Sequence, residues 1–273
     1  MECKLKRISV HYEICGEGRP LISLHGFSPD HRSMSGCLEP IFEHRGGWQR
    51  IYPDLPGMGK TPGKEWITNS DQMLDIVLEF IDQVIPGQRF VLAGDSYGGY
   101  LARGIIHRRP AVVDGLLLIC PLITADPARR TVPPHVTLVT DSTLISGLEP
   151  DDREVFESLA VVQSQRIWER TRDEVIVGLN IAEEDFLTRL QAHGYPLSLD
   201  VDAAPPFEKP TLILAGRQDA IVGYRDAWGI LENYPRSTFV VLDRAGHLLE
   251  REQETLFSAL VSEWLDRVDE NLI

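Results

Sequence analysis

A serine between glycines is the first residue whose surroundings suggest chemistry. Residues 91–99, V-L-A-G-D-S-Y-G-G, place Ser96 in a G-x-S-x-G pattern between an apolar run and a helical pattern. This arrangement is typical of a nucleophile elbow, a sharp strand-to-helix turn that exposes the serine hydroxyl. Gly94 and Gly98 remove side chains that would collide in such a turn, and a helix N-terminus favours a developing anion. We therefore predict that Ser96 is a nucleophile; the alternative interpretation is a tight turn without chemistry.

A serine hydroxyl needs a base to take its proton and an acid to orient that base. Downstream of this motif, Asp219 follows the apolar run 211–215, and His247 follows the run 239–242. Both lie just beyond the carboxyl end of a predicted strand, where sites in open α/β sheets are found. We predict Asp219 as the acid and His247 as the base. Asp126, which follows the run 115–120, is the first alternative acid.

Acyl transfer also needs backbone N–H groups that stabilise an oxyanion. Tyr97 directly follows the serine, and Phe27 ends the H-G-F segment after the apolar run 21–24. We predict these two residues as the donors, although His25 and Gly26 would form a turn there in any case. Asp95, before the serine, is interpreted as a hydrogen-bonding residue of the turn, with tuning of His247 or selection against anionic acyl groups as the alternative.

The elements that must position these residues follow a β-α rhythm. Short β-rich runs alternate with helical patterns, which is typical of a mostly parallel sheet covered by helices. We predict about eight strands, in an α/β fold flanked by helices, near residues 4–8, 11–16, 21–24, 50–53, 90–94, 115–120, 211–215 and 239–242. A helix over 73–84 is expected to begin at a capping pair formed by Asn69 and Gln72. Two further helices are expected, around 225–232 and over 256–265.

The β-α rhythm stops after Pro121 and resumes near residue 207. The intervening segment is rich in acidic residues and holds several short amphipathic stretches. We predict a core of residues 1–121 and 207–273 interrupted by a helical cap, residues 122–206, that forms a mobile lid over Ser96. Within the cap, Trp168 is predicted to contact substrate, with burial in the core of the cap as the alternative; Arg166 is a second candidate.

Five motifs in this order resemble the α/β-hydrolase family, namely H-G-F at 25–27, D-L-P-G-M-G at 54–59, G-D-S-Y-G-G at 94–99, G-R-Q-D at 216–219 and A-G-H at 245–247. The chain is most similar to single-domain members that have a helical cap and use no cofactor or metal. The resemblance implies the triad of Ser96, Asp219 and His247, oxyanion donors at Phe27 and Tyr97, and a pocket lined by Val222 and Leu248. No motif lies in the cap, so substrate identity does not transfer.

Two departures narrow the expected chemistry. Position 96 is serine where the dehalogenases and epoxide hydrolases of this family carry aspartate, and H-G-F-S-P replaces the H-G-G-P-G of proline iminopeptidases. We expect a serine hydrolase that cleaves an ester-like bond, carboxylic ester, thioester or lactone, of a small molecule through an acyl-serine. The alternatives are a carbon-carbon bond hydrolase or lyase on the same scaffold, and a ligand receptor that retains the triad.

The composition of the chain limits which partners the protein is expected to bind. The 273 residues carry 27 Lys and Arg against 41 Asp and Glu, a net charge of −14 that repels nucleic acids and anionic lipids. No apolar run reaches the length of a membrane span, and the charged N-terminus lacks an apolar signal region. We expect a cytoplasmic protein, monomer or homodimer, with a small-molecule substrate. Its four cysteines form no C-x-x-C pair and are expected to be reduced.

Overall fold

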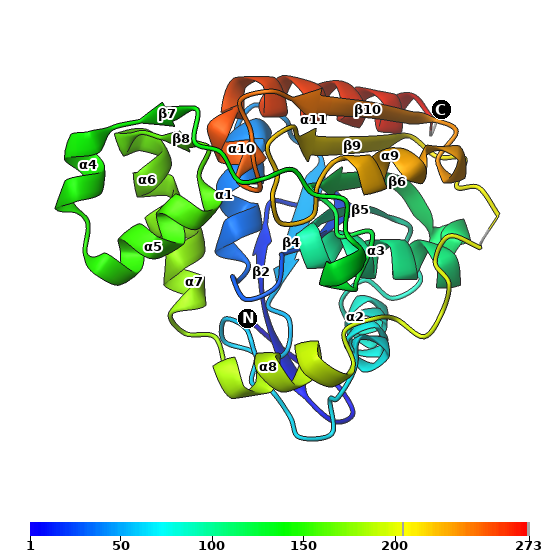
Figure 1. Ribbon diagram of the computed structural model, residues 1–273. Coiled ribbons are helices and arrows are strands. Elements are labelled where there is room, and N and C mark those ends of the chain that lie inside the picture. Colours follow the sequence, from blue (N-terminus) through cyan, green and yellow to red (C-terminus); the bar gives the residue numbers. More distant parts are fainter. Residues whose placement is uncertain (204, 272–273) are drawn as a thin grey trace.

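The computed structural model describes residues 1–203 and 205–271, and an eight-stranded sheet forms its centre (Figure 1). The strand order is β1-β2-β4-β3-β5-β6-β9-β10. β2 pairs antiparallel with both β1 and β4, and every other pair is parallel. The mostly parallel sheet of about eight strands that the sequence predicts is therefore confirmed. The strands are β1 (Glu2–Lys4), β2 (Ser9–Cys15), β3 (Arg19–Leu24), β4 (Trp48–Pro53), β5 (Phe90–Asp95), β6 (Val113–Ile119), β9 (Thr211–Gly216) and β10 (Ser237–Leu242).

The central strands are continuous apolar runs because both of their faces are covered. Every residue of β6 and of β9 is buried, and so is every residue of β5 except Asp95. Such runs are typical of parallel strands with helices on both faces. The parallel register sets Leu24 opposite Gly94, and Asp95 opposite Ile119. The carboxyl ends of β3, β5 and β6 therefore meet at one edge of the sheet.

Helices cover this sheet in two groups. α1 contacts α11, and α2 contacts α3, which also packs on β3, β5 and β6. Asn69 caps the N-terminus of α2: its Oδ1 accepts the Gln72 N–H at 2.9 Å, while Gln72 Oε1 accepts the Thr68 N–H at 2.6 Å. The capping pair is present, with the glutamine reaching one residue further back than expected. The helices of the core are α1 (Arg32–Phe42), α2 (Ser70–Val84), α3 (Ser96–Arg108), η1 (Pro110–Val112), α9 (Arg225–Gly229), η4 (Leu231–Asn233), α10 (Leu249–Glu252) and α11 (Glu254–Glu270).

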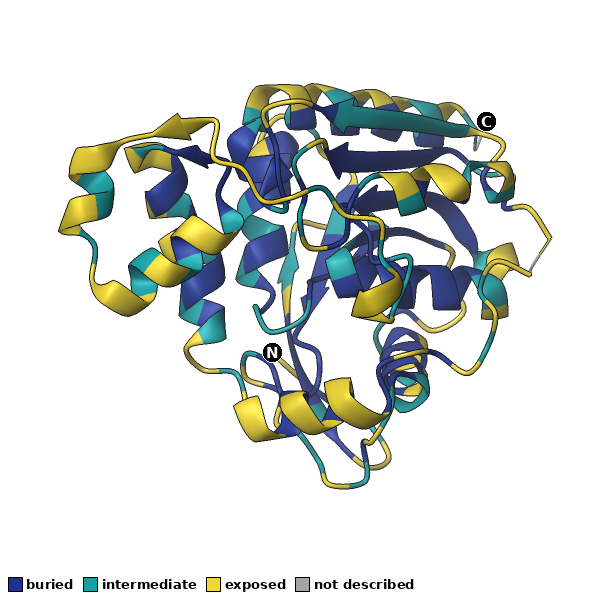
Figure 2. Cartoon of the chain, viewed as in Figure 1, coloured by how far each residue is buried: buried dark blue, intermediate teal, exposed yellow. Residues whose placement is uncertain are grey.

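The segment between β6 and β9 is largely helical and has two parts (Figures 1 and 2). The first part has a small apolar cluster of its own, which includes Phe156 and Trp168. The second part, α8, instead buries Phe186, Leu187 and Leu190 in the main core. The elements are η2 (Pro127–Arg129), β7 (Val139–Thr140), α4 (Ser142–Gly147), α5 (Pro150–Leu159), β8 (Val162–Gln163), α6 (Gln165–Thr171), the π-helical η3 (Arg172–Ile176), α7 (Val177–Leu179) and α8 (Glu184–His193).

Some boundaries differ from the sequence prediction. The first strand covers Glu2–Lys4 rather than residues 4–8, because the chain turns where the Leu5 N–H donates to Ile8 O at 2.9 Å. The predicted ranges 122–206 and 207–273 include residues 204 and 272–273, which lie outside the described residues. No helix in the described part of the chain is long and apolar enough to cross a membrane.

Candidate active site

Ser96 lies where β5 ends and α3 begins, and its backbone is left-handed, with φ at +49°. A non-glycine residue in this region is strained, and such strain is concentrated at functional sites. A side chain added at Gly94 would lie 2.5 Å from Gly98 O, and one added at Gly98 would collide with Leu24 O. Glycine at both positions therefore lets the turn close against the end of β3.

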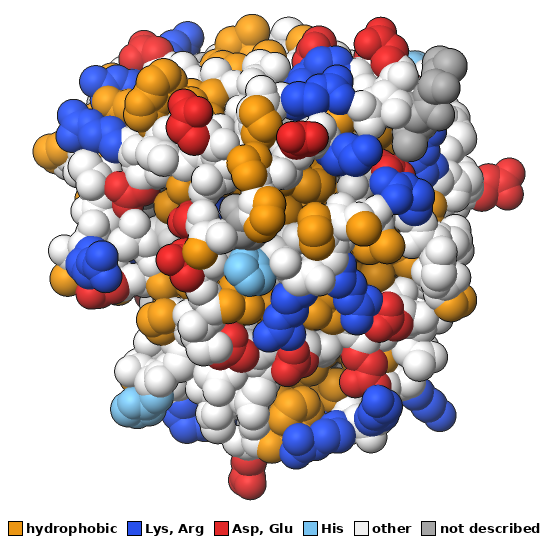
Figure 3. Space-filling view, turned by 90° about the vertical axis from the view of Figure 1, so that its right-hand side faces the viewer, with side chains coloured by type: hydrophobic (Ala, Val, Ile, Leu, Met, Phe, Trp, Pro, Cys, Tyr) orange, Lys and Arg blue, Asp and Glu red, His pale blue; other side chains and the backbone are white. Residues whose placement is uncertain are grey.

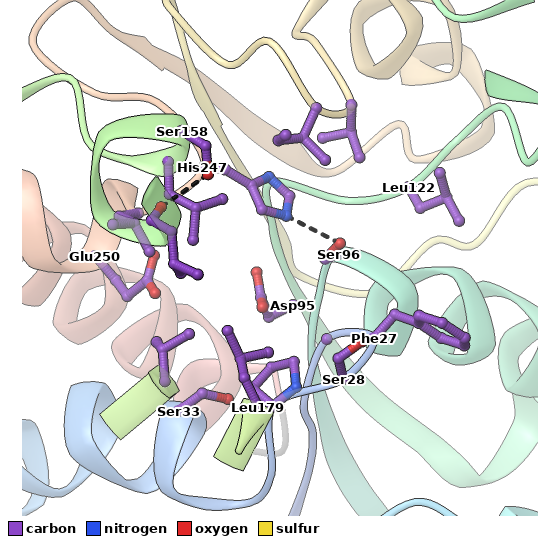
Figure 4. Close-up of a pocket in the computed structure, with 18 of the residues that line it drawn as sticks. Phe27, Ser28, Ser33, Asp95, Ser96, Leu122, Ser158, Leu179, His247 and Glu250 are labelled. Carbon is purple, nitrogen blue, oxygen red and sulfur yellow. Dashed lines mark hydrogen bonds between the residues drawn. The ribbon is translucent and has the colours of Figure 1, made fainter. Parts of the chain in front are cut away.

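One line of hydrogen bonds connects Ser96, His247 and Asp219. His247 Nε2 lies 3.1 Å from Ser96 Oγ (Figure 4), and its Nδ1 lies 2.9 Å from Asp219 Oδ2. The other oxygen of Asp219 accepts the N–H groups of Ile221 and Val222 at 2.8 and 3.1 Å. The fold thus brings together three predicted residues that are up to 151 positions apart.

Asp126, the alternative acid, is not part of this arrangement. It is exposed, and its Oδ1 accepts the Ala128 N–H at 3.0 Å, where it caps the short helix η2. The geometry therefore favours Asp219 as the partner of His247.

Burial and the two nearby carboxylates set the basicity of His247. Burial disfavours the imidazolium, but the charge of Asp219, its hydrogen bond and the charge of Asp95 outweigh this effect and raise the pKa of His247 to about 9. For Asp219, burial by itself would raise the pKa, but His247 and two backbone N–H groups hold this pKa below its ordinary value. The site is therefore arranged to stabilise a protonated His247 next to an ionised Asp219.

The predicted oxyanion donors flank the serine. Tyr97 lies in the first turn of α3, where backbone N–H groups have no intrahelical acceptor. Phe27 follows Gly26, at which an added side chain would lie 3.3 Å from Ser96 Cβ. The rings of Phe27, Tyr97 and Tyr195 pack together at centroid distances of 5.1–5.3 Å, which fixes the two backbone segments relative to each other.

His25 has a positioning role that the sequence reasoning missed. This fully buried imidazole lies 2.8 Å from Gly26 O through Nδ1, and its Nε2 accepts the Leu55 N–H at 2.9 Å. Burial lowers the pKa of His25, which favours the neutral ring that can donate and accept at once. It ties the H-G-F loop to the D-L-P-G-M-G loop, so the joint presence of these two motifs was the available signal.

Glu252 is a second positioning residue that the sequence reasoning missed. Its Oε1 accepts the N–H groups of Val161 and Val162 at 2.6 and 3.0 Å, and its Oε2 accepts the Gly246 N–H at 2.6 Å. The carboxylate therefore connects the helical insertion to the residue before His247. No sequence pattern pointed to Glu252, because all three of its partners are backbone groups.

A cavity of about 360 Å³ opens beside Ser96 and His247 (Figure 4). Its wall is shared between loops of the core and the helical insertion, so both contribute to its shape. Val222 and Leu248, the predicted pocket residues, lie in this wall. The lining residues are Gly26, Phe27, Ser28, Pro29, Ser33, Asp95, Ser96, Leu122, Arg130, Val155, Ser158, Leu159, Val175, Leu179, Gln191, Tyr195, Ile221, Val222, His247, Leu248, Glu250 and Arg251.

Trp168 does not line the cavity, which corrects its prediction as a substrate contact. Its indole is 6% exposed and packs edge-to-face on Phe156 at a centroid distance of 5.3 Å, inside the apolar cluster of the insertion. A large apolar ring in a small helical unit is used to form that unit's core. Arg166 also lies away from the cavity, where it is exposed and pairs with Glu254.

Two groups of side chains have the donor atoms that metal ions prefer, with those atoms within 4.8 Å of one another. One joins Cys120 to Asp219 and His247, and there the histidine and the aspartate are already hydrogen-bonded to each other. The other joins His11, His31 and Asp54, and its His31–Asp54 bond is 2.7 Å long. In both groups the histidine and the carboxylate are hydrogen-bonded to each other, so neither requires an ion as its partner.

A sequence model described as the alpha/beta hydrolase family matches residues 21–259. The pimeloyl-(acyl-carrier protein) methyl ester esterase of Legionella pneumophila (strain Corby) is 26% identical over 268 residues, covering 94% of this chain and all of that protein. A 2-hydroxy-6-oxononadienedioate/2-hydroxy-6-oxononatrienedioate hydrolase of Pseudomonas putida is 23% identical, covering 94% and 92%. The crystal structure of an alpha/beta superfamily hydrolase from Oenococcus oeni PSU-1 has a TM-score of 0.89 and 30% identity, covering 98% and 99%.

Proposed function

The chain belongs to the alpha/beta hydrolase family, and from this premise we propose that it hydrolyses an ester-like bond of a small molecule through an acyl-Ser96 intermediate. The observation that carries the proposal is the continuous hydrogen bonding from Asp219 through His247 to Ser96 at the mouth of a cavity. The esterase name of the Legionella relative supports the same reaction class.

In the first half of the reaction, Ser96 Oγ attacks the carbonyl carbon of the ester. His247 Nε2 takes the hydroxyl proton, and Asp219 stabilises the imidazolium that forms. The N–H groups of Phe27 and Tyr97 donate to the oxyanion. The tetrahedral species collapses as the imidazolium protonates the leaving alcohol or thiol, which departs and leaves the acyl group on Ser96.

In the second half, water takes the place of the leaving group. His247 Nε2 removes a proton from the water, whose oxygen attacks the acyl carbon. Collapse of this second tetrahedral species returns the proton to Ser96 Oγ and releases the carboxylic acid. The same three side chains therefore serve both halves, and no other group has to change its protonation state.

The walls of the cavity support a small substrate with an apolar portion. Val155, Leu159, Val175 and Leu179 of the helical insertion and Leu248 after the base contribute apolar surface to it. We assign residues 122–206 as a cap over Ser96 that sets the acyl chain-length preference. A carboxylic ester, a thioester or a lactone each fits this chemistry.

Labelling with a fluorophosphonate probe tests the proposal. We expect mass spectrometry to place the adduct on Ser96, and Ser96→Ala to abolish both labelling and the hydrolysis of p-nitrophenyl and thioester acyl panels. The matched control is Ser158→Ala, because Ser158 lines the same cavity with its hydroxyl bonded to Val155 O at 2.8 Å, and this variant keeps the adduct on Ser96.

The result that rejects this assignment is an adduct on another residue, or none in protein that is active. Product analysis in labelled water separates an acyl-serine route from carbon-carbon bond cleavage or lyase chemistry, and ligand binding without turnover indicates a receptor. The cytoplasmic location, the lack of nucleic-acid partners and the state of monomer or homodimer stay predictions from the sequence.

A further inference from the structure

Two carboxylate oxygens in the wall of the cavity have no hydrogen-bond donor. Asp95 Oδ1 and Glu250 Oε2 are buried, and neither has a partner among the described residues. Both residues line the cavity, and Glu250 is only 3% exposed. In Figure 4, the Asp95 carboxylate from the elbow and the Glu250 carboxylate from α10 border the same open part of the pocket. These oxygens are therefore placed where a bound molecule would meet them.

The neighbouring cation does not reach these two oxygens. Arg251 donates to Glu250 Oε1 and, through Nη2, to Ser33 O at 3.1 Å, and its Nε forms an ion pair with Glu174 Oε2 at 3.0 Å without a hydrogen bond. Its guanidinium is thus shared among two carboxylates and a carbonyl. Glu174 is not a lining residue and also pairs with Arg170 at 2.7 Å, so among the described residues the carboxylates that line the cavity are those of Asp95 and Glu250.

The other arginine of the cavity is held by backbone carbonyls. Arg130 donates through Nε to Thr124 O at 2.9 Å, through Nη1 to Ile221 O at 3.2 Å, and through Nη2 to Ala125 O at 3.0 Å. Three of its five N–H donors are therefore engaged with backbone carbonyls. These bonds hold the guanidinium against the backbone of residues 124, 125 and 221.

A buried carboxylate oxygen without a donor costs free energy, and a bound donor removes that cost. Burial raises the pKa of Asp95 to about 6, with Asp219 adding to the effect and with His247 and Arg251 opposing it, in agreement with a carboxylate that lacks donors. Buried polar groups without protein partners call for an explanation, and a ligand group that donates hydrogen bonds supplies one here.

We propose that Asp95 and Glu250 form a subsite for a hydrogen-bond-donating end of the substrate, a hydroxyl or an ammonium group, and that they exclude a carboxylate from it. This inference rests on the proposed function, because it specifies the part of the ester that lies away from the scissile bond. The subsite narrows the proposed substrates to esters that carry a hydroxyl or ammonium group, and not a carboxylate, at the end away from the scissile bond.

Binding to the Ser96→Ala protein tests the subsite without requiring turnover. The probes are methyl esters of graded chain length with an unsubstituted, ω-hydroxy, ω-amino or ω-carboxy acyl end, and the matching acetate esters with these groups on the alcohol. By calorimetry we expect hydroxy- or amino-ended probes in one of the two series to bind roughly tenfold or more tightly than unsubstituted ones, and carboxy-ended ones most weakly. The hydroxy and amino arms show which donor is preferred.

Glu250→Gln in the Ser96→Ala background replaces the unpaired oxygen with an amide NH₂ group. The remaining amide oxygen can still accept from Arg251. We expect the preference for donor-ended probes to fall roughly tenfold and the carboxy-ended probes to gain affinity. The matched control is Glu263→Gln, which removes the same charge from the exposed face of α11 and leaves the order of affinities unchanged. If Glu250→Gln does not fold, as judged by circular dichroism, Asp95→Asn takes its place with the same expectation.

Equal affinities across the ends in both series, tightest binding of the carboxy-ended probes, or no binding of any donor-ended probe overturns the subsite. Failure of the wild-type protein to hydrolyse any ester overturns the proposed function instead. Because affinity is measured on Ser96→Ala and hydrolysis on the wild type, the two failures are distinguishable.

Discussion

The carboxylates of Asp219 and Asp95 together raise the basicity of His247. A histidine in water titrates near pH 6.5, so the sequence alone predicts an activity that rises between about pH 6 and 7.5. In the structure, Asp219 and Asp95 raise the pKa of His247 to about 9. Since His247 must be neutral to accept the Ser96 proton, activity rises as the pH increases through this raised pKa. The acidic limb is therefore expected at higher pH than a histidine in water would give, and a pH–rate profile distinguishes the two expectations.

Asp95→Asn tests this account at the scale of one residue. The substitution keeps the shape of the side chain and removes one negative charge, so the imidazolium becomes less stable and the pKa of His247 falls. We expect the acidic limb of kcat/KM to move to lower pH than in the wild type. The measurement is a pH–rate profile with a non-ionisable methyl ester, under conditions where chemistry limits the rate. An unchanged limb, or one that moves to higher pH, contradicts the role of Asp95.

Glu252 links two elements that the chain itself keeps apart. It ends α10, and its carboxylate accepts N–H groups from Val161 and Val162 of the insertion and from Gly246 of the loop that carries His247. A carboxylate can accept from both directions because each of its oxygens is an acceptor. The position of His247 and the docking of the insertion therefore depend on the same side chain.

Glu252→Gln tests this connection. One amide oxygen can replace only one of the two acceptors, so an NH₂ group would face a backbone N–H. We expect the free energy of unfolding to fall by about 1–3 kcal/mol and kcat to fall more than KM rises, because His247 is displaced. Urea unfolding and steady-state kinetics measure the two effects, with Glu263→Gln as the control. Wild-type kinetics in a destabilised variant would mean that Glu252 holds the fold but not the base.

The π-helical segment η3 also acts between elements. It continues the helix after α6, and within it Glu174 pairs with Arg251 while Val175 lines the cavity. π-Helical turns are rare and are frequently found at functional sites. A side chain added at Gly36 of α1 would lie 2.5 Å from Glu174, so the two helices approach closely at this point. The segment therefore joins the insertion to the core beside the proposed subsite.

At the scale of the whole molecule, the two parts of the insertion differ in how firmly they are held. α4 has no buried residue and α5 buries only Phe156, whereas α2 in the core buries eight residues (Figure 2). α8 is exposed on its outer face but buries Phe186, Leu187 and Leu190 in the main core. Local stability follows the apolar contacts of a segment. The part of the cap that can move is therefore expected to be α4 and α5.

Hydrogen–deuterium exchange tests this expectation. We predict that amides of α4 and α5 exchange faster than those of α2 and of strands β5 and β6, because fewer buried contacts must break to expose them. α8 serves as the internal control, since it belongs to the same insertion and packs on the main core, and it should be slower than α4. Equal protection of α4, α5 and α2 would show that the insertion is as rigid as the core.

The net charge of −14 does not make every face of the protein uniformly acidic. The face in Figure 3 carries acidic and basic side chains next to each other, with apolar side chains between them. On this face no large field of one sign is expected. We therefore assign selection at the cavity to local groups such as Asp95 and Glu250.

The sequence by itself determined the fold class, the order of the strands along the chain and the place of Ser96 in a strand-to-helix turn. The reason is that these features are local: G-x-S-x-G specifies a sharp turn, and continuous apolar runs specify strands buried on both faces. Asp219 and His247 were predictable for a related reason. Each follows the end of a parallel strand, and the ends of parallel strands meet at one edge of the sheet.

Only the tertiary structure decided which residues line the cavity. Trp168 was predicted in the pocket but lies in the core of the insertion, while Glu250 and Glu252 carried no motif and proved to line the cavity and to hold the base loop. Their positions depend on how an insertion with its own small core docks on a distant helix. Docking is determined by side chains and backbone groups far apart in the chain, and no periodicity or local spacing records it.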